Sequence, residues 1–126
     1  MIIPKTIERI INEIKKYGLE MRIDLYQDNY FDTEPTIDCA NIYVGSMEDH
    51  LKIEYSSSGC GFEYLSLSFQ IENNKYYFFE NEERVDIFVN IFQKFEDIFS
   101  MINDFYYSQD TFAQLVEKFD KLKGEL

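Results

Sequence analysis

The spacing of apolar residues changes period twice along this chain, and this change constrains the fold more than any other feature. At the N-terminus, apolar residues recur every three or four positions, which predicts an amphipathic helix: Ile3, Ile7, Ile10, Ile11, Ile14 and Tyr17. Between residues 21 and 79, apolar residues instead alternate with polar ones, as in strands with one buried face. Beyond residue 85 the helical spacing returns. The order helix, sheet, helix, helix predicts an α+β fold.

The alternating region predicts an antiparallel meander of about five strands. We expect these strands over residues 21–26, 37–44, 51–55, 65–71 and 75–79. The apolar alternation shifts by one position between Cys39 and Ala40, which predicts a bulge in the second strand. Asn73 and Asn74 both tolerate positive φ, so they predict a tight hairpin turn between the last two strands.

The helices at both ends of the sequence have recognisable boundaries. Pro4 suits a first helical turn, and Gly18 suits the left-handed residue that ends a helix. Asn81 predicts the N-cap of a long Phe-rich helix, and Ser108 predicts the N-cap of a final helix. We expect both C-terminal helices to pack on the sheet within a single acidic α+β domain, residues 1–126. The Phe-rich face of these helices is then expected to form part of the hydrophobic core. The alternative is that this face lines a ligand pocket.

The composition favours a folded protein with basic partners. The chain has 24 Asp and Glu against 12 Lys and Arg, a net charge of −12, while 45% of its residues are hydrophobic. Such a protein repels phosphate backbones and anionic lipids, which disfavours direct binding to nucleic acid or to a membrane surface. No apolar run approaches the ~20 residues of a membrane span. The first nine residues lack a signal core, so we expect a cytoplasmic location.

Few residues of this sequence suggest catalysis. His50 is the single histidine, and Cys39 and Cys60 are the only cysteines, which we expect to be unbridged in a reducing cytoplasm. A Cys–His nucleophilic site stays open as an alternative, because such sites assemble from residues distant in sequence. However, His50 follows Glu48 and Asp49 in what we expect to be an exposed turn. We therefore predict a protein that is not an enzyme and uses no cofactor.

A metal site is also not expected. Asp28, Asp32, Glu34 and Asp38 have suggestive spacing, but they lack the glycine and the terminal glutamate of a calcium-binding loop. A solvated acidic loop is the interpretation that fits these residues better.

Negative charge is concentrated in the middle of the chain. Residues 1–22 carry a net charge of +2 and residues 118–126 a net charge of +1, so residues 23–117 carry −15. From Ile23 to Leu51 there are seven acidic residues and no Lys or Arg. We expect the surplus negative charge of residues 23–117 to gather on one side and to face a cationic groove of a partner, with tyrosines such as Tyr26 and Tyr43 stacking on its arginines. A surface that merely maintains solubility is the alternative.

The layout resembles that of small phage-encoded anti-CRISPR proteins, which inhibit the RNA-guided nuclease of type II CRISPR systems. The similarity is closest over residues 72–126. There ENNKYYFFENEERVDIFVNIF is similar to the Asn-rich hairpin, short strand, acidic cap and long helix of that family, and the KGEL ending is similar too. The resemblance implies a DNA mimic in the host bacterial cell. Such a mimic occupies the Arg-lined cleft in which the nuclease reads duplex DNA.

The resemblance also implies contact residues. Glu72, Asn73 and Asn74 match the family's hairpin contact by position, and Asp104 and Asp110 match its contact at the helix junction. The helix junction is aromatic in this chain and more acidic in the family. We therefore expect the acidic segment between residues 28 and 49 to contribute to partner binding, through Asp28, Tyr30, Asp32, Glu34, Glu48 and Asp49. The alternative function is a bacterial immunity protein that neutralises a basic nuclease toxin, which size and charge fit equally well.

Overall fold

The computed structural model describes residues 3–27, 37–57, 61–83, 90–91 and 93–125 of the 126-residue chain. The chain divides into two compact units, Met1–Glu83 and Arg84–Leu126, which we call the sheet unit and the helical unit. Within these residues the predicted α+β layout is confirmed: one helix, five antiparallel strands in meander order and two C-terminal helices follow one another. Packing of the C-terminal helices on the sheet stays a prediction.

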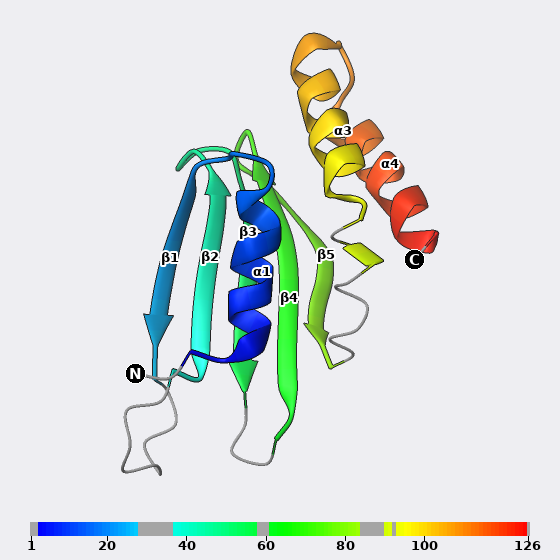
Figure 1. Ribbon diagram of the computed structural model, residues 1–126. Helices are drawn as coiled ribbons and strands as arrows, with labels where there is room; N and C mark the ends of the chain where they lie inside the picture. The colour runs from blue at the N-terminus through cyan, green and yellow to red at the C-terminus, as the bar shows by residue number, and fades with distance from the viewer. Residues whose placement is uncertain (1–2, 28–36, 58–60, 84–89, 92, 126) are drawn as a thin grey trace. The chain divides into compact units, whose positions relative to one another are not determined.

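The sheet unit is a helix followed by an open five-stranded sheet in which sequential strands are neighbours (Figure 1). Its elements are α1 (Lys5–Lys15), β1 (Met21–Tyr26), β2 (Cys39–Gly45), β3 (His50–Ser57), β4 (Glu63–Ile71) and β5 (Asn74–Glu82). Gly18 has a φ of +65°, which confirms the predicted left-handed residue after α1.

The core of the sheet unit lies between α1 and one face of the sheet. Figure 1 shows α1 running along that face in front of β3, with β4 beside it. The buried side chains of α1 are Ile7, Ile10 and Ile14, one turn apart. On the sheet, the register joins Ile42, Ile53 and Leu67 in one fully buried row. Each such aliphatic side chain stabilises the fold by about 1.5–3 kcal/mol, so this row and α1 account for much of the unit's stability.

A carboxylate fastens α1 to the sheet. Glu63, the first residue of β4, accepts hydrogen bonds of 2.6 Å from the Thr6 hydroxyl of α1 and of 2.6 Å from the Tyr55 hydroxyl of β3. Burial, together with the hydrogen bond to Glu63 and its charge, raises the pKa of Tyr55 well above its usual range. Tyr55 therefore stays a neutral donor, and Glu63 links α1 directly to β4 and, through Tyr55, to β3.

The bulge predicted in β2 is wrong. β2 pairs residue by residue with β1 and with β3, without a shift of register. Cys39 and Ala40 are both buried although they lie on opposite faces, so the changed alternation marks burial of both faces at this end of the strand. The irregularities lie between β4 and β5, where Leu67 pairs with Phe79 and Ser68 with Tyr77. β5 thus has one more residue than β4 across this interval.

The helical unit contains α3 (Phe95–Tyr107) and α4 (Phe112–Gly124), which pack together. The cap predicted at Asn81 is wrong, because Asn81 lies within β5 with a φ of +51° and donates its N–H to the Ser66 hydroxyl. The cap predicted at Ser108 is also wrong, because Ser108 ends α3. Residues 84–89 and 92, where the long Phe-rich helix was expected to begin, lie outside the described residues.

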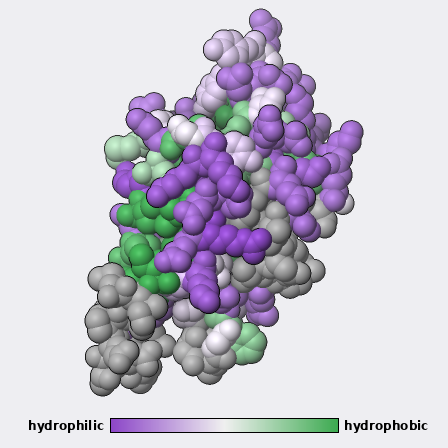
Figure 2. Space-filling model, in the orientation of Figure 1, coloured by the Kyte–Doolittle hydropathy of each residue, from purple (hydrophilic) through white to green (hydrophobic). Residues whose placement is uncertain are grey.

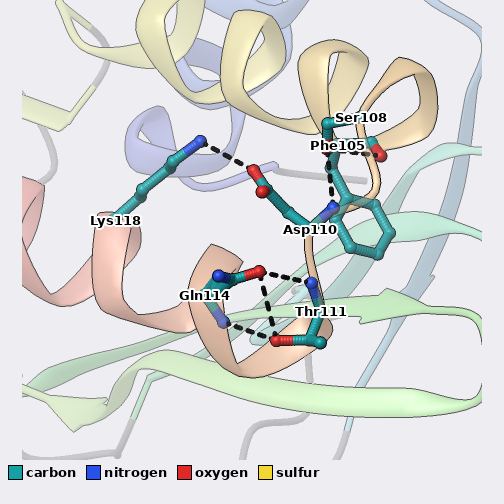
Figure 3. Close-up of polar contacts among 6 residues, drawn as sticks. All are labelled: Phe105, Ser108, Asp110, Thr111, Gln114 and Lys118. Carbon is teal, nitrogen blue, oxygen red and sulfur yellow. Dashed lines mark hydrogen bonds and ion pairs between the residues drawn. The ribbon is translucent and has the colours of Figure 1, made fainter.

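Thr111 is the residue that caps α4. Its hydroxyl accepts a hydrogen bond from the Gln114 N–H at 3.3 Å, while the Gln114 side chain accepts one from the Thr111 N–H at 2.8 Å (Figure 3). This reciprocal capping box satisfies two of the backbone donors that a helix start leaves open. In the part of the chain that the structure describes, no helix is both long and apolar enough to cross a membrane.

Candidate functional site

Two hairpin turns lie at the same end of the sheet because the strands form a meander. In the turn from β2 to β3, the N–H of Ser46 donates to the carbonyl of Asp49 at 2.9 Å. The N–H of Asp49 donates back to the Ser46 hydroxyl at 3.0 Å, and Nδ1 of His50 lies 3.2 Å from the Ser46 carbonyl. These bonds close a compact turn that presents Glu48 to solvent.

The turn from β4 to β5 is a two-residue turn of Glu72 and Asn73. Both residues have positive φ, +51° and +67°, as a type I′ hairpin turn requires. The prediction of Asn73 and Asn74 was wrong by one position, because the register pairs Ile71 with Asn74 and leaves only two residues between them. Asn74 begins β5, and its side-chain amide donates to the Glu72 carbonyl at 3.1 Å.

A hydrogen bond joins the two turns. The N–H of Glu72 donates to Oδ1 of Asp49 at 2.8 Å, across 23 residues of sequence. Three carboxylates and two amides therefore form one surface, which we call the acidic hairpin end: Glu48, Asp49, Glu72, Asn73 and Asn74. All are exposed except Asp49, which is half-buried. Five of the residues predicted for partner binding are thus brought together.

Sequence reasoning missed one further carboxylate at this end of the sheet. The carbonyl of Glu20 accepts a hydrogen bond from the Gly45 N–H at 3.0 Å, which places the start of β1 beside the end of β2. The side chain of Glu20 is exposed. Glu20 was overlooked because it belongs to the N-terminal segment of net charge +2, and its position between a helix and the first strand was the available signal.

The other predicted contact residues lie outside the described residues or in the helical unit. Asp28, Tyr30, Asp32 and Glu34 lie outside the described residues. Asp104 and Asp110 belong to the helical unit. Asp104 is exposed on α3, whereas Asp110 forms an ion pair with Lys118, in which Nζ and Oδ2 are 3.3 Å apart (Figure 3).

Two acidic residues between Ile23 and Leu51 do not belong to the acidic hairpin end. Asp38 is only 9% exposed, so it contributes little to any surface. Asp24 lies in the middle of β1, opposite Asn41 and away from the turns. Among the described acids of that segment, only Glu48 and Asp49 belong to the acidic hairpin end.

Tyr43 does not offer a vacant ring for a partner's arginine. On the face of the sheet opposite α1, the Arg22 guanidinium lies 4.3 Å from the centre of the Tyr43 ring and the Lys52 ammonium lies 5.5 Å from it. Lys52 also pairs with Glu54 at 3.1 Å. The ring of Tyr43 is thus covered by cations of the same chain, and the tyrosine stacks on the protein's own arginine.

The structure separates the residues of one catalytic alternative. Cys39 pairs with Ser56 at one end of β2, while His50 pairs with Gly45 at the other end. Six residues of extended chain span about 20 Å, so Cys39 and His50 do not form a nucleophilic pair. Cys60, the other candidate, lies outside the described residues. Within the described ranges, no three His, Cys, Asp or Glu side chains are grouped so as to hold a metal ion.

Comparison with family models, with curated proteins and with solved structures finds no match to this chain.

Proposed function

We propose that this protein is a stoichiometric inhibitor that binds a basic protein partner through the acidic hairpin end. The observation that carries this proposal is the 2.8 Å hydrogen bond from the Glu72 N–H to Asp49, because it holds two separate turns as one surface. A preorganised surface avoids the ordering cost that flexible loops incur on binding.

The chemistry of the acidic hairpin end suits a cationic groove. Exposed carboxylates accept charge-assisted hydrogen bonds from Arg and Lys, which are about twice as strong as neutral ones. The amides of Asn73 and Asn74 offer donors and acceptors beside these charges, as the base edges of DNA do beside phosphates. The net charge of −12 also accelerates the encounter with a basic partner.

The partner that we propose is the RNA-guided nuclease of a type II CRISPR system, in line with the resemblance of residues 72–126 to anti-CRISPR proteins. Glu72, Asn73 and Asn74 then occupy the cleft in which the nuclease reads duplex DNA, so DNA binding is blocked. A nuclease toxin is the alternative partner and presents the same kind of basic cleft. The gene neighbourhood distinguishes the two partners. A toxin gene next to the gene of this protein would support binding to a toxin, whereas a location in a phage operon would support binding to the RNA-guided nuclease.

Charge reversal at the acidic hairpin end tests the proposal. The double variant Glu48→Lys with Glu72→Lys is expected to weaken binding to the guide-loaded nuclease at least tenfold, roughly, because like charges then face each other. Binding of the wild-type protein is also expected to weaken as salt rises from about 0.1 to 0.5 M, since exposed charges are screened over about 10 Å or less. Affinity is measured by calorimetric titration, with release of duplex DNA as a second readout.

The matched control reverses two exposed acids elsewhere. Glu8→Lys with Glu80→Lys changes the net charge by the same amount, and neither residue lies in the two turns. We expect this variant to bind within about threefold of the wild type, because distant exposed charges are largely screened. Equal losses in both variants would show a non-specific charge effect and would contradict a defined contact surface.

A further inference from the structure

β1 is an edge strand whose outer hydrogen-bonding groups point away from the sheet. In the part of the chain that the structure describes, β1 pairs with β2 alone. The bond from the Gly45 N–H to the Glu20 carbonyl fixes which residues of β1 face β2. Because these groups alternate along a strand, Arg22 and Asp24 bond to β2, whereas the N–H and C=O groups of Met21, Ile23 and Leu25 point outward.

The outer edge of β1, whose sequence is MRIDLY, lacks three of the features that commonly prevent strand pairing, namely proline, lysine and a bulge. The side chains on the α1 side of the strand, Met21, Ile23 and Leu25, are only half-buried. Figure 2 shows apolar surface on the β1 side of α1. The outer edge of β1 thus offers another strand both outward-pointing backbone N–H and C=O groups and apolar surface.

We propose that a second copy of this chain pairs with β1 in antiparallel orientation about a two-fold axis. Ile23 then pairs with Ile23 of the second copy, and Met21 pairs with Leu25 of the second copy, so that all outward-pointing groups of β1 are used. Between these pairs, Arg22 lies opposite Asp24 of the second copy, and the symmetry repeats this pair. The apolar residues meet on one face and the opposite charges on the other.

The charges of β1 select this register over its neighbours. A slip of two residues places Arg22 opposite Arg22 or Asp24 opposite Asp24, which is destabilising because like charges then face directly. A slip of one residue places outward-pointing backbone groups opposite inward-pointing ones, so the ladder of hydrogen bonds is lost. Only one register combines the full ladder with two opposite-charge pairs.

This dimer is independent of the proposed inhibition. Because β1 starts at the acidic hairpin end and the two strands run in opposite directions, the two acidic hairpin ends lie at opposite ends of a continuous sheet of both copies. Each copy can therefore bind a partner molecule while the dimer persists.

Sedimentation equilibrium of the full chain, over about 1–100 µM, tests the pairing. We expect the wild type to dimerise. Arg22→Asp and Asp24→Arg are each expected to raise the dissociation constant of the dimer at least tenfold, roughly, because each puts like charges opposite in both symmetry-related pairs. The double variant Arg22→Asp with Asp24→Arg restores opposite charges, and its dissociation constant should return to within about threefold of the wild type.

Far-UV circular dichroism of each variant establishes that it is folded. Substitution of Arg22 also removes its contact with the Tyr43 ring. The variant Asp24→Asn leaves that contact in place and only removes the charge of Asp24, so it serves as a milder second test with a smaller expected rise of the dissociation constant. A wild type that stays monomeric over the whole range would overturn the proposal and favour a strand of another protein at this edge. Single variants that dimerise like the wild type, or a folded double variant that does not recover, would overturn the register.

Discussion

Replacing Gly45 with alanine should destabilise the protein by about 3 kcal/mol, the sum of backbone strain and steric overlap. Gly45 ends β2 with a φ of +117°, a conformation that side chains rarely adopt. A Cβ atom at this position would lie 2.7 Å from the carbonyl oxygen of Asp49, which is part of the backbone and cannot move aside easily. The free energy of unfolding is measured by urea titration.

Gly18→Ala is the matched control for this prediction. Gly18 also has a positive φ, +65°, but a Cβ atom there meets nothing within 4 Å. We expect a loss of about 1 kcal/mol, the cost of the left-handed conformation alone. Equal losses at the two positions would contradict the account of the turn, since Gly45 combines a less accessible φ with a close contact to Asp49 that Gly18 lacks.

Glu63→Ala is expected to lower the free energy of unfolding by about 3 kcal/mol, because hydrogen bonds to charged groups contribute about 1.5–3 kcal/mol each. The substitution removes the acceptor of both the Thr6 and the Tyr55 hydroxyl groups. Tyr55 is only 3% exposed, so water cannot readily replace the lost partner. The helix α1 also loses its polar attachment to the sheet.

Glu54→Ala provides the comparison for this loss. Glu54 lies on the neighbouring strand β3, and its carboxylate pairs with Lys52 at the surface. Exposed ion pairs contribute about 0–1 kcal/mol, so this variant should remain close to the wild type in urea unfolding. If Glu63→Ala proved equally mild, the attachment of α1 through Glu63 would be energetically unimportant and the account would be wrong.

The elements of the fold could be predicted from the sequence because their signals are local. The spacing of Ile7, Ile10 and Ile14 marks α1, and strict alternation marks β3 and β4. The helix caps failed because several residue types compete for that position. Ser108 and Thr111 are both good N-caps, and the decisive signal was Gln114, three residues after Thr111, which completes a capping box.

Other errors came from signals that permit several structures. Asn81 tolerates positive φ, a property that the structure uses within β5 and not at a helix start. The apolar alternation around Cys39 depends on what covers each face, which tertiary structure decides. The turn at Glu72 and Asn73 differs from the predicted one by a single residue, because strand register fixes the turn and local propensity does not.

The site itself could be predicted only in part. The negative charge of the segment and the family resemblance identified Glu48, Asp49 and Glu72 as candidates. That they form one surface depends on a hydrogen bond between residues 23 positions apart in the sequence. Such a contact follows from the order and register of four strands, which no local pattern encodes. For the same reason, the burial of Asp38 and the position of Glu20 beside Gly45 emerge only from the folded structure.

Hydrogen–deuterium exchange of this protein, alone and bound to the guide-loaded nuclease, tests the central claim most directly. The account predicts slower exchange on binding at the backbone amides of the two turns, residues 45–50 and 71–75, with little change along α1. Protection confined to other segments, or the absence of any complex with the nuclease, would contradict the account of the acidic hairpin end as the contact surface.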